Sequence, residues 1–243
     1  MKEFEVFQDV AALPVTTDAC LFGSWIEKQL SIYLQENPTA NILDIGTGTG
    51  LLCFMLAQKH QYIKLMGIDI HQPSLENAKQ SLAFNQQKFQ KYKNIEFFNQ
   101  DFTTTNLFVN NQFHAIISNP PFFQNQLESS NSTRNIARHS NELTPEILIA
   151  QSAQLLTENG QFFLLYPYSE FQSIVDILKK YFVLIQTVNI QPTPNKNPHL
   201  VFFHAEKSSN KNTNKSDVFC VYREPGILSD NSVSLLKDYY ITL

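Results

Sequence analysis

The segment DIGTGTG, at positions 44–50, constrains the fold of this chain more than any other. It follows an apolar run at 41–45 and precedes another at 51–59, so it predicts a strand-to-helix turn. Three of the seven glycines in the chain stand within it, as Gly46, Gly48 and Gly50. Glycine lets a backbone turn sharply and approach a ligand, and the start of a helix supplies free N–H groups. A tight turn without a ligand is the alternative, which this concentration of glycines disfavours.

The spacing of this loop differs from that of two phosphate-binding loops. Leu51 stands where the dinucleotide pattern GxGxxG needs a glycine, and no Lys-Ser/Thr pair follows as in a P-loop. Asp44 comes directly before the glycines, and Asp69 ends the next expected strand. An acidic residue at that place in a Rossmann sheet can accept both hydroxyls of a ribose. The pattern therefore favours a ligand that contains a ribose.

Strand-like and helix-like segments alternate through the central part of the chain, which predicts βαβ units and a parallel sheet. The expected strands are 41–45, 63–68, 94–98, 113–118, 161–166 and 182–190, and the expected helices are 19–35, 51–59, 73–89, 145–156, 169–180 and 229–240. Residues 199–205 and 218–222 are expected to pair as a hairpin around the low-complexity tip 206–217. Asp18 is a candidate N-cap for the first helix. No composition break separates a second domain, so we expect one domain over 1–243, with an N-terminal segment and helix over 1–37 and a core over 38–243.

A second motif, Asn119-Pro120-Pro121-Phe122, follows the expected strand 113–118. Open α/β sheets bind ligands at the carboxyl ends of their strands. The two prolines remove two N–H donors, so the loop carbonyls and the amide oxygen of Asn119 are left to accept hydrogen bonds, as a bound –NH₂ group requires. Stacking on Phe122 is worth about 1–3 kcal/mol, which helps to offset the few kcal/mol needed to flip a base. An ordinary Pro-Pro turn with Phe122 in the core is the alternative.

Composition limits the partners and the site chemistry. The 18 basic and 22 acidic residues give a net charge of −4, so any nucleic-acid contact must come from a local basic group. Arg134 and Arg138, two of the three arginines, follow the second motif and are candidates for phosphate contacts, with a solvated loop as an equal alternative. The three cysteines are far apart and the histidines lack ligand spacing, so no metal site is expected.

Targeting signals are also not expected. The acidic start of the chain does not resemble a signal peptide, and the longest apolar run, 51–57, is short against the roughly 20 residues that span a bilayer. We therefore expect no membrane association and a cytoplasmic location. No feature of the sequence indicates an obligate protein partner.

These residues resemble the class I S-adenosylmethionine-dependent methyltransferases over nearly the whole chain. The resemblance implies a Rossmann-like α/β fold, with a mostly parallel seven-stranded sheet and a C-terminal antiparallel hairpin. It implies that S-adenosylmethionine binds to Thr17, Asp18, Asp44, Gly46, Gly48, Gly50, Asp69 and Asp101. In that scheme Asp69 holds the ribose, Asp101 lies beside the adenine, and Thr17 and Asp18 close the methionine side.

The second motif resembles the one in members of this class that methylate an amino group conjugated to a planar system. It implies a catalytic set of Asn119, Pro120, Pro121 and Phe122. More narrowly, the chain resembles the bacterial tRNA1(Val) (adenine(37)-N6)-methyltransferases in Phe7 and in the segments 15–18, 21–25, 134–138 and 236–240. This resemblance implies N6-methylation of a flipped adenine in tRNA. That family often has Tyr where this chain has Phe122.

Other functions remain open from the sequence. One is guanine-N2 methylation of ribosomal RNA, which uses a similar loop. Another is glutamine-N5 methylation of release factors, although the roughly forty residues before Asp44 leave little room for the N-terminal helical domain of that family. DNA adenine methylation would need a separate target-reading domain. A catalytically silent RNA-binding module is the non-enzymatic alternative, against which an intact Asp44, Asp69 and Asn119 argue.

Overall fold

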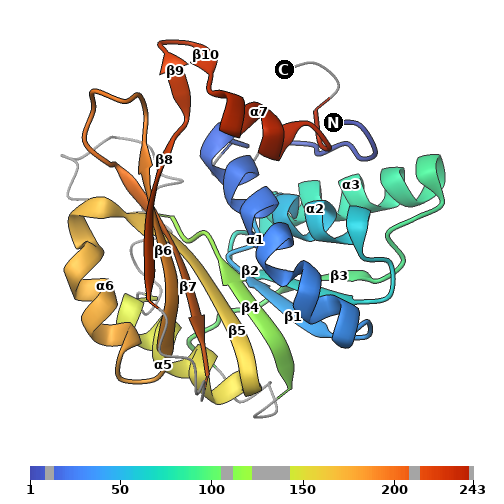
Figure 1. Cartoon of the computed structure of the whole chain (residues 1–243). Coiled ribbons are helices and arrows are strands. Elements are labelled where there is room, and N and C mark those ends of the chain that lie inside the picture. The colour runs from blue at the N-terminus through green and yellow to red at the C-terminus, as the bar shows by residue number, and fades with distance from the viewer. Residues whose placement is uncertain (9–13, 105–111, 122–142, 208–213, 241–243) are drawn as a thin grey trace, which may run out of the picture.

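The computed structural model describes residues 1–8, 14–104, 112–121, 143–207 and 214–240. Its central feature is an eight-stranded sheet in the order β3-β2-β1-β4-β5-β7-β6-β8, with helices on both faces (Figure 1). The strands are β1 Asn41–Ile45, β2 Lys64–Asp69, β3 Ile95–Asn99, β4 Phe113–Ser118, β5 Leu156–Pro167, β6 Val183–Gln191, β7 Leu200–Glu206 and β8 Lys215–Cys220. Only β7 runs antiparallel to its neighbours in this sheet, β5 and β6.

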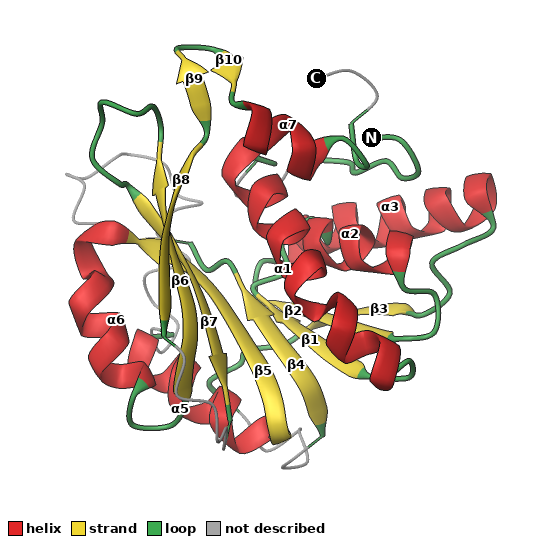
Figure 2. Cartoon of the chain, viewed as in Figure 1, coloured by secondary structure: helices red, strands yellow, loops and turns green. Residues whose placement is uncertain are grey.

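The helices form two layers, as Figure 2 shows. They are α1 Thr17–Glu36, α2 Leu51–Lys59, α3 Gln72–Phe89, α5 Pro145–Leu155, the 3₁₀ turn η2 Tyr168–Glu170, α6 Phe171–Leu178 and α7 Asp230–Leu236. Buried residues of α1, α2 and α3 share one hydrophobic cluster with one face of the sheet, and those of α5 and α6 share a second cluster with the other face. The predicted Rossmann-like α/β class is therefore confirmed. No helix in the described part of the chain is long and apolar enough to cross a membrane.

Two details of the predicted sheet were wrong. The main sheet has eight strands rather than seven, and β7 and β8 do not pair with each other. β6 lies between them because the short connection from β6 makes β7 its antiparallel partner, whereas β8 joins the far side of β6 in parallel register. A C-terminal antiparallel hairpin is present, but it is formed by β9 (Tyr222–Glu224) and β10 (Ile227–Leu228).

The aromatic residues of β5 and β7 fill both sides of the sheet. Phe162 and Phe163 are each 0% exposed, and consecutive strand residues point to opposite faces. Phe163 packs edge-on against Trp25 of α1, with ring centroids 5.7 Å apart, whereas Phe162 stacks on Phe182 at 5.2 Å. Strands of a sheet that is covered on both faces have nearly continuous apolar sequences, which explains the many phenylalanines in these strands.

Helix starts follow ordinary capping rules, with one correction. The N-cap of α1 is Thr16, whose hydroxyl accepts a hydrogen bond from the backbone N–H of Ala19 at 3.1 Å. Asp18 lies one residue inside the helix and is not the N-cap. Its negative charge in the first turn still complements the helix dipole, and its side chain is left available for other contacts.

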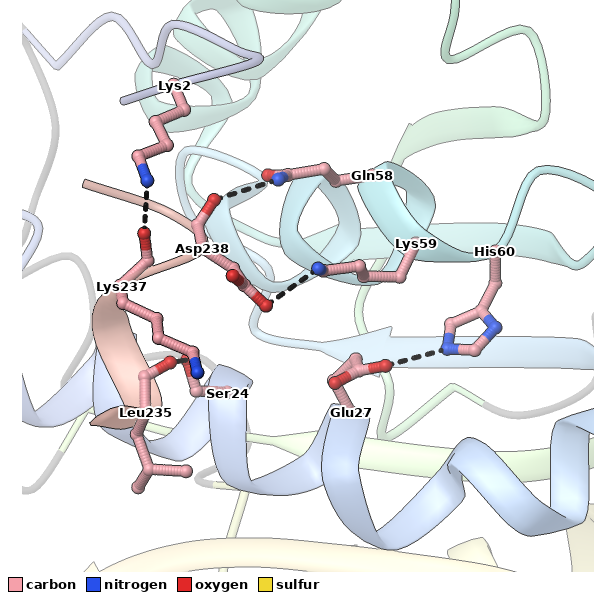
Figure 3. A network of polar contacts seen from close by, with 9 residues as sticks. All are labelled: Lys2, Ser24, Glu27, Gln58, Lys59, His60, Leu235, Lys237 and Asp238. Carbon is pink, nitrogen blue, oxygen red and sulfur yellow. Dashed lines mark hydrogen bonds and ion pairs between the residues drawn. The ribbon is translucent and has the colours of Figure 1, made fainter. Parts of the chain in front are cut away.

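The C-terminal segment is tied to α1 and α2 by the polar network in Figure 3. Asp238 accepts from Gln58 Nε2 at its carbonyl (3.0 Å) and from Lys59 Nζ at its carboxylate (2.8 Å). Ser24 Oγ donates to the carbonyl of Leu235 at 3.0 Å. These contacts tie the C-terminal segment to α1 through Ser24 and to the last turn of α2, the helix that begins at the glycine loop, through Gln58 and Lys59.

Candidate active site at the carboxyl end of the sheet

Four of the predicted site segments leave neighbouring parallel strands at one end of the sheet. Ile45 of β1 is paired with Ser118 of β4 and with Ile68 of β2, so the glycine loop, the segment from Asn119 and Asp69 all begin side by side. Asp69 is in turn paired with Asn99, the last residue of β3, two residues before Asp101. The order across this end of the sheet is therefore Asp101, Asp69, the glycine loop and Asn119.

The glycine loop adopts backbone conformations that favour glycine. Gly46, Gly48 and Gly50 have φ values of 71°, 55° and 80°. A Cβ at Gly50 would lie 2.5 Å from Cζ of Phe97, so both space and backbone require glycine there. A Cβ built at Gly46 would lie 4.0 Å from Cα of Pro120, so the two predicted motifs lie next to each other.

Asp69 holds the glycine loop against β2. Its Oδ2 accepts from the backbone N–H of Gly48 and its Oδ1 from that of His71, both at 2.8 Å. Burial raises the pKa of this carboxyl, and the two backbone N–H groups oppose the rise. A carboxylate offers about four lone-pair positions, so Asp69 keeps acceptor capacity for a ribose hydroxyl without losing its loop contacts.

Asp44 is a buried carboxyl group of which only one oxygen has hydrogen-bond partners among the described residues. Its Oδ2 accepts from Thr47 Oγ1 at 2.6 Å and more weakly from Cys53 Sγ at 3.6 Å. Within the described residues its Oδ1 has no hydrogen-bond partner, although the side chain is 1% exposed. Burial raises the pKa of Asp44 to about 7, and the nearby Asp69 adds to the rise. A cationic ligand at this end of the sheet would therefore relieve an electrostatic cost.

Asp101 shapes the turn after β3. Its Oδ1 accepts from the backbone N–H of Thr103 at 2.8 Å and from the hydroxyl of the same residue at 2.7 Å. One carboxylate oxygen is thus used to fix the turn. The half-buried side chain lies at the outer end of the row that contains Asp69.

The segment after β4 is held by Ser118, whose Oγ donates to the carbonyl of Ile45 at 2.9 Å. Asn119 is half-buried, Pro120 is buried and Pro121 is exposed. The predicted Phe122, Arg134 and Arg138 lie outside the described residues.

The start of α1 reaches the same end of the sheet. Thr17 and Asp18 form its first turn, and Asp18 Oδ2 lies 3.4 Å from Nε2 of His199. His199 directly precedes β7, whose first residue, Leu200, is paired with Pro167 at the carboxyl end of β5. The structure therefore brings Asp18 to the end of the sheet that carries the glycine loop.

Sequence reasoning missed three groups at this site. Thr47 and Cys53 contact Asp44, and His199 contacts Asp18. The Asp-x-x-Thr spacing within the loop could have indicated the first contact, whereas the Asp18–His199 contact spans 181 positions and has no local signal. Among the described residues no group of three or more His, Cys, Asp or Glu side chains could hold a metal ion.

An open α/β sheet with a glycine loop and acidic residues at its carboxyl end defines a class of nucleoside-binding proteins. Within that class, residues 28–193 match the family described as the methyltransferase small domain. The match covers more than half of the chain, so the chain belongs to this family.

Two curated relatives carry one name. The tRNA1(Val) (adenine(37)-N6)-methyltransferase of Vibrio vulnificus strain YJ016 is 26% identical over 243 residues, which cover 100% of this chain and 95% of the relative. The protein of that name from Pedobacter heparinus is 29% identical, with 99% and 96% of the two chains covered. A solved structure described as a predicted O-methyltransferase from Agrobacterium tumefaciens superposes with a TM-score of 0.63 at 18% identity, over 82% of this chain and 89% of that one. This last likeness concerns the fold alone.

Proposed function

We propose that this chain transfers a methyl group from S-adenosylmethionine to N6 of an adenine in tRNA. The observation that carries the proposal is that the glycine loop and the Asn119–Pro121 segment leave the paired ends of β1 and β4, at Ile45 and Ser118. The full-length similarity to relatives named as tRNA1(Val) (adenine(37)-N6)-methyltransferases supports the choice of substrate. A tRNA substrate also implies a cytoplasmic location.

The site fits S-adenosylmethionine as the methyl donor. The donor carries an ammonium and a sulfonium charge, and Asp44 is a buried carboxylate whose Oδ1 has no partner among the described residues. The donor also carries a ribose, and Asp69 keeps acceptor capacity for a ribose hydroxyl beside its bonds to the loop. The residues proposed to hold the donor are Thr17, Asp18, Asp44, Gly46, Gly48, Gly50, Asp69 and Asp101. When bound, the donor supplies a methyl group on a good leaving group, so the protein contributes mainly through positioning.

On the acceptor side, the chain offers hydrogen-bond acceptors where an exocyclic amine is to be oriented. The side-chain oxygen of Asn119 and the carbonyl of Pro120 would accept the two amine hydrogens and leave the nitrogen lone pair directed elsewhere. Pro120 and Pro121 have no N–H, so neither competes as a donor at this position. We propose Phe122 as the face on which the flipped base stacks, and Arg134 and Arg138 as phosphate contacts.

The test is transfer of a tritiated methyl group from S-adenosylmethionine into total RNA that lacks this modification and, in parallel, into total protein, followed by nucleoside and amino-acid analysis. We expect the label in N6-methyladenosine of the tRNA fraction. Label in N2-methylguanosine of ribosomal RNA, or in protein glutamine, would overturn the proposed substrate. Binding of the donor with no transfer to any of these acceptors would overturn the proposed activity.

A further inference from the structure

One contact at the carboxyl end of the sheet joins three elements that are distant in the sequence. His199, which directly precedes β7, places Nδ1 3.0 Å from the carbonyl oxygen of Ile190, the penultimate residue of β6. Its Nε2 lies 3.4 Å from Oδ2 of Asp18 in the first turn of α1. The ring thus bridges the sheet and the helix that covers it.

The partners of the two ring nitrogens fix the protonation state of this bridge. A backbone carbonyl can only accept, so Nδ1 must carry a proton to bond Ile190. An ionised carboxylate also only accepts, so Nε2 must carry a proton to bond Asp18. Both bonds together require the doubly protonated imidazolium. The neutral ring that keeps the bond to Ile190 would turn a lone pair of Nε2 toward the carboxylate.

α1, which carries Asp18, packs on the helix that follows the glycine loop. A Cβ at Gly23 of α1 would lie 2.6 Å from Sδ of Met55 and 3.1 Å from Cδ2 of Leu52, so α1 packs closely on the first turns of α2. α2 begins directly after the glycine loop. Asp18 precedes Gly23 by five positions, which is about 7.5 Å along the helix. Asp18 therefore lies less than two helical turns from the point where α1 packs on α2, and its contact with His199 places it at the carboxyl end of the sheet, where the donor is proposed to bind.

We propose that His199, as the imidazolium, is a positioning residue that fixes Asp18 and the first turn of α1 at the donor side of the site. The proposal rests on the proposed function, because its measurable consequence is the affinity for S-adenosylmethionine. It adds a residue to the site that neither motif contains.

The surroundings of the ring give the sign of the pH dependence. The hydrogen bond to Asp18 raises the pKa of His199 from 6.5, and burial partly opposes the rise. On α1 the nearest other titratable group is Cys20, whose pKa is raised by burial to about 11, so that it is a neutral thiol. β6 presents the neutral carbonyl of Ile190, and η2 donates the backbone N–H of Tyr168 to the carbonyl of His199 at 2.9 Å. The bridge is therefore complete at low pH and is lost as the pH rises through the pKa of the folded protein.

The first experiment measures the dissociation constant of S-adenosylmethionine by calorimetry between pH 6 and pH 9. Three proteins are compared: the wild type, His199→Gln and the matched control His60→Gln, whose histidine pairs with Glu27 at 3.2 Å away from this site (Figure 3). The donor's own amine titrates in this range for every protein, so the difference between proteins is the readout. Between pH 6 and pH 9 we expect the dissociation constant of the wild type and of His60→Gln to rise by about threefold to fivefold more than that of His199→Gln.

The second experiment follows the imidazole resonances of the ligand-free protein by NMR as a function of pH. We expect the pKa of His199 to lie above 6.5 in the wild type and to fall in Asp18→Asn. A pKa at or below 6.5 in the wild type, or equal pH slopes for wild type and His199→Gln, would overturn the role of His199. Failure of the wild type to bind S-adenosylmethionine at any pH would overturn the proposed function as well. Normal binding with equal pH slopes would overturn the role of His199 alone.

Discussion

Two polar regions of this molecule differ in how their charged side chains are compensated. In the C-terminal network, Lys59 and Asp238 face each other at 2.8 Å with side chains 33% and 48% exposed, so both charges are paired and hydrated. At the carboxyl end of the sheet, Asp44 is buried and has an oxygen without a partner among the described residues. Exposed pairs of the first kind contribute little to stability, whereas an uncompensated buried carboxylate carries a real cost. The comparison indicates that the first region is a surface brace of small energetic weight, whereas the second is arranged for a ligand.

The largest expected effect concerns the stability of the ligand-free protein when Asp44 is replaced by Asn. The pKa of Asp44 is raised to about 7 from 3.8, so its contribution to stability is greatest below pH 3.8 and is lost as the pH rises to about 7. A shift of this size corresponds to a loss of about 4 kcal/mol in the wild type relative to Asp44→Asn. Urea unfolding of both proteins between pH 4 and pH 8 measures the difference.

The matched control for this comparison is Asp217→Asn, a carboxylate on β8 that accepts from Gln186 Nε2 at 2.6 Å in an exposed position. It should show the pH dependence of the wild type. Parallel stability curves for wild type and Asp44→Asn would contradict the view that Asp44 is strained in the absence of a ligand.

A somewhat smaller effect is expected for donor binding in Asp69→Ala. The variant loses the acceptor proposed for the ribose and also the bond that fixes Gly48. Hydrogen bonds to a charged group are worth about 1.5–3 kcal/mol each, so the dissociation constant of S-adenosylmethionine should rise by at least about a hundredfold. Calorimetry would measure it, with Asp217→Ala as the control. An affinity within a fewfold of the wild type would show that Asp69 only holds the loop.

The smallest effect is expected in the C-terminal network. Lys59→Ala removes the ion pair with Asp238 and should lower the free energy of unfolding by about 0.2–1 kcal/mol without changing donor affinity. Lys59 lowers the pKa of Asp238 below 3.8, so the loss should disappear as the pH falls through that range, and it should shrink in high salt. Lys79→Ala, on the exposed side of α3, is the control. A loss of several kcal/mol would mean that the network is more than a surface brace.

Local patterns accounted for most of the fold and for the position of the candidate site. The expected β1, β4 and α2 have the bounds seen in the structure, because each is an apolar run bordered by turn residues. The glycine loop and the segment from Asn119 were expected at the carboxyl end of one sheet, and the pairing of Ile45 with Ser118 brings them together. The single-domain division of the chain stays a prediction.

The predictions that were wrong concern features that depend on contacts between residues distant in the sequence. Periodicity identifies a strand but not its neighbours, so the placement of β6 between β7 and β8 could not be derived. The cap of α1 was assigned to Asp18 rather than Thr16 because both residue types are good caps two positions apart. The contact of His199 with Asp18 depends on the antiparallel direction of β7, which begins at the carboxyl end of the sheet directly after His199.

The central claim is that one end of the sheet combines a donor site with a separate amine-orienting site at Asn119. The most direct test measures donor affinity and the rate of methyl transfer to unmodified tRNA on one preparation of Asn119→Ala, with Asn119→Asp, which keeps an acceptor oxygen, beside it. We expect the rate of Asn119→Ala to fall by at least about a hundredfold while its donor affinity stays within about threefold of the wild type, and Asn119→Asp to keep more activity than Asn119→Ala. Normal turnover by Asn119→Ala would rule out the amine-orienting role of Asn119.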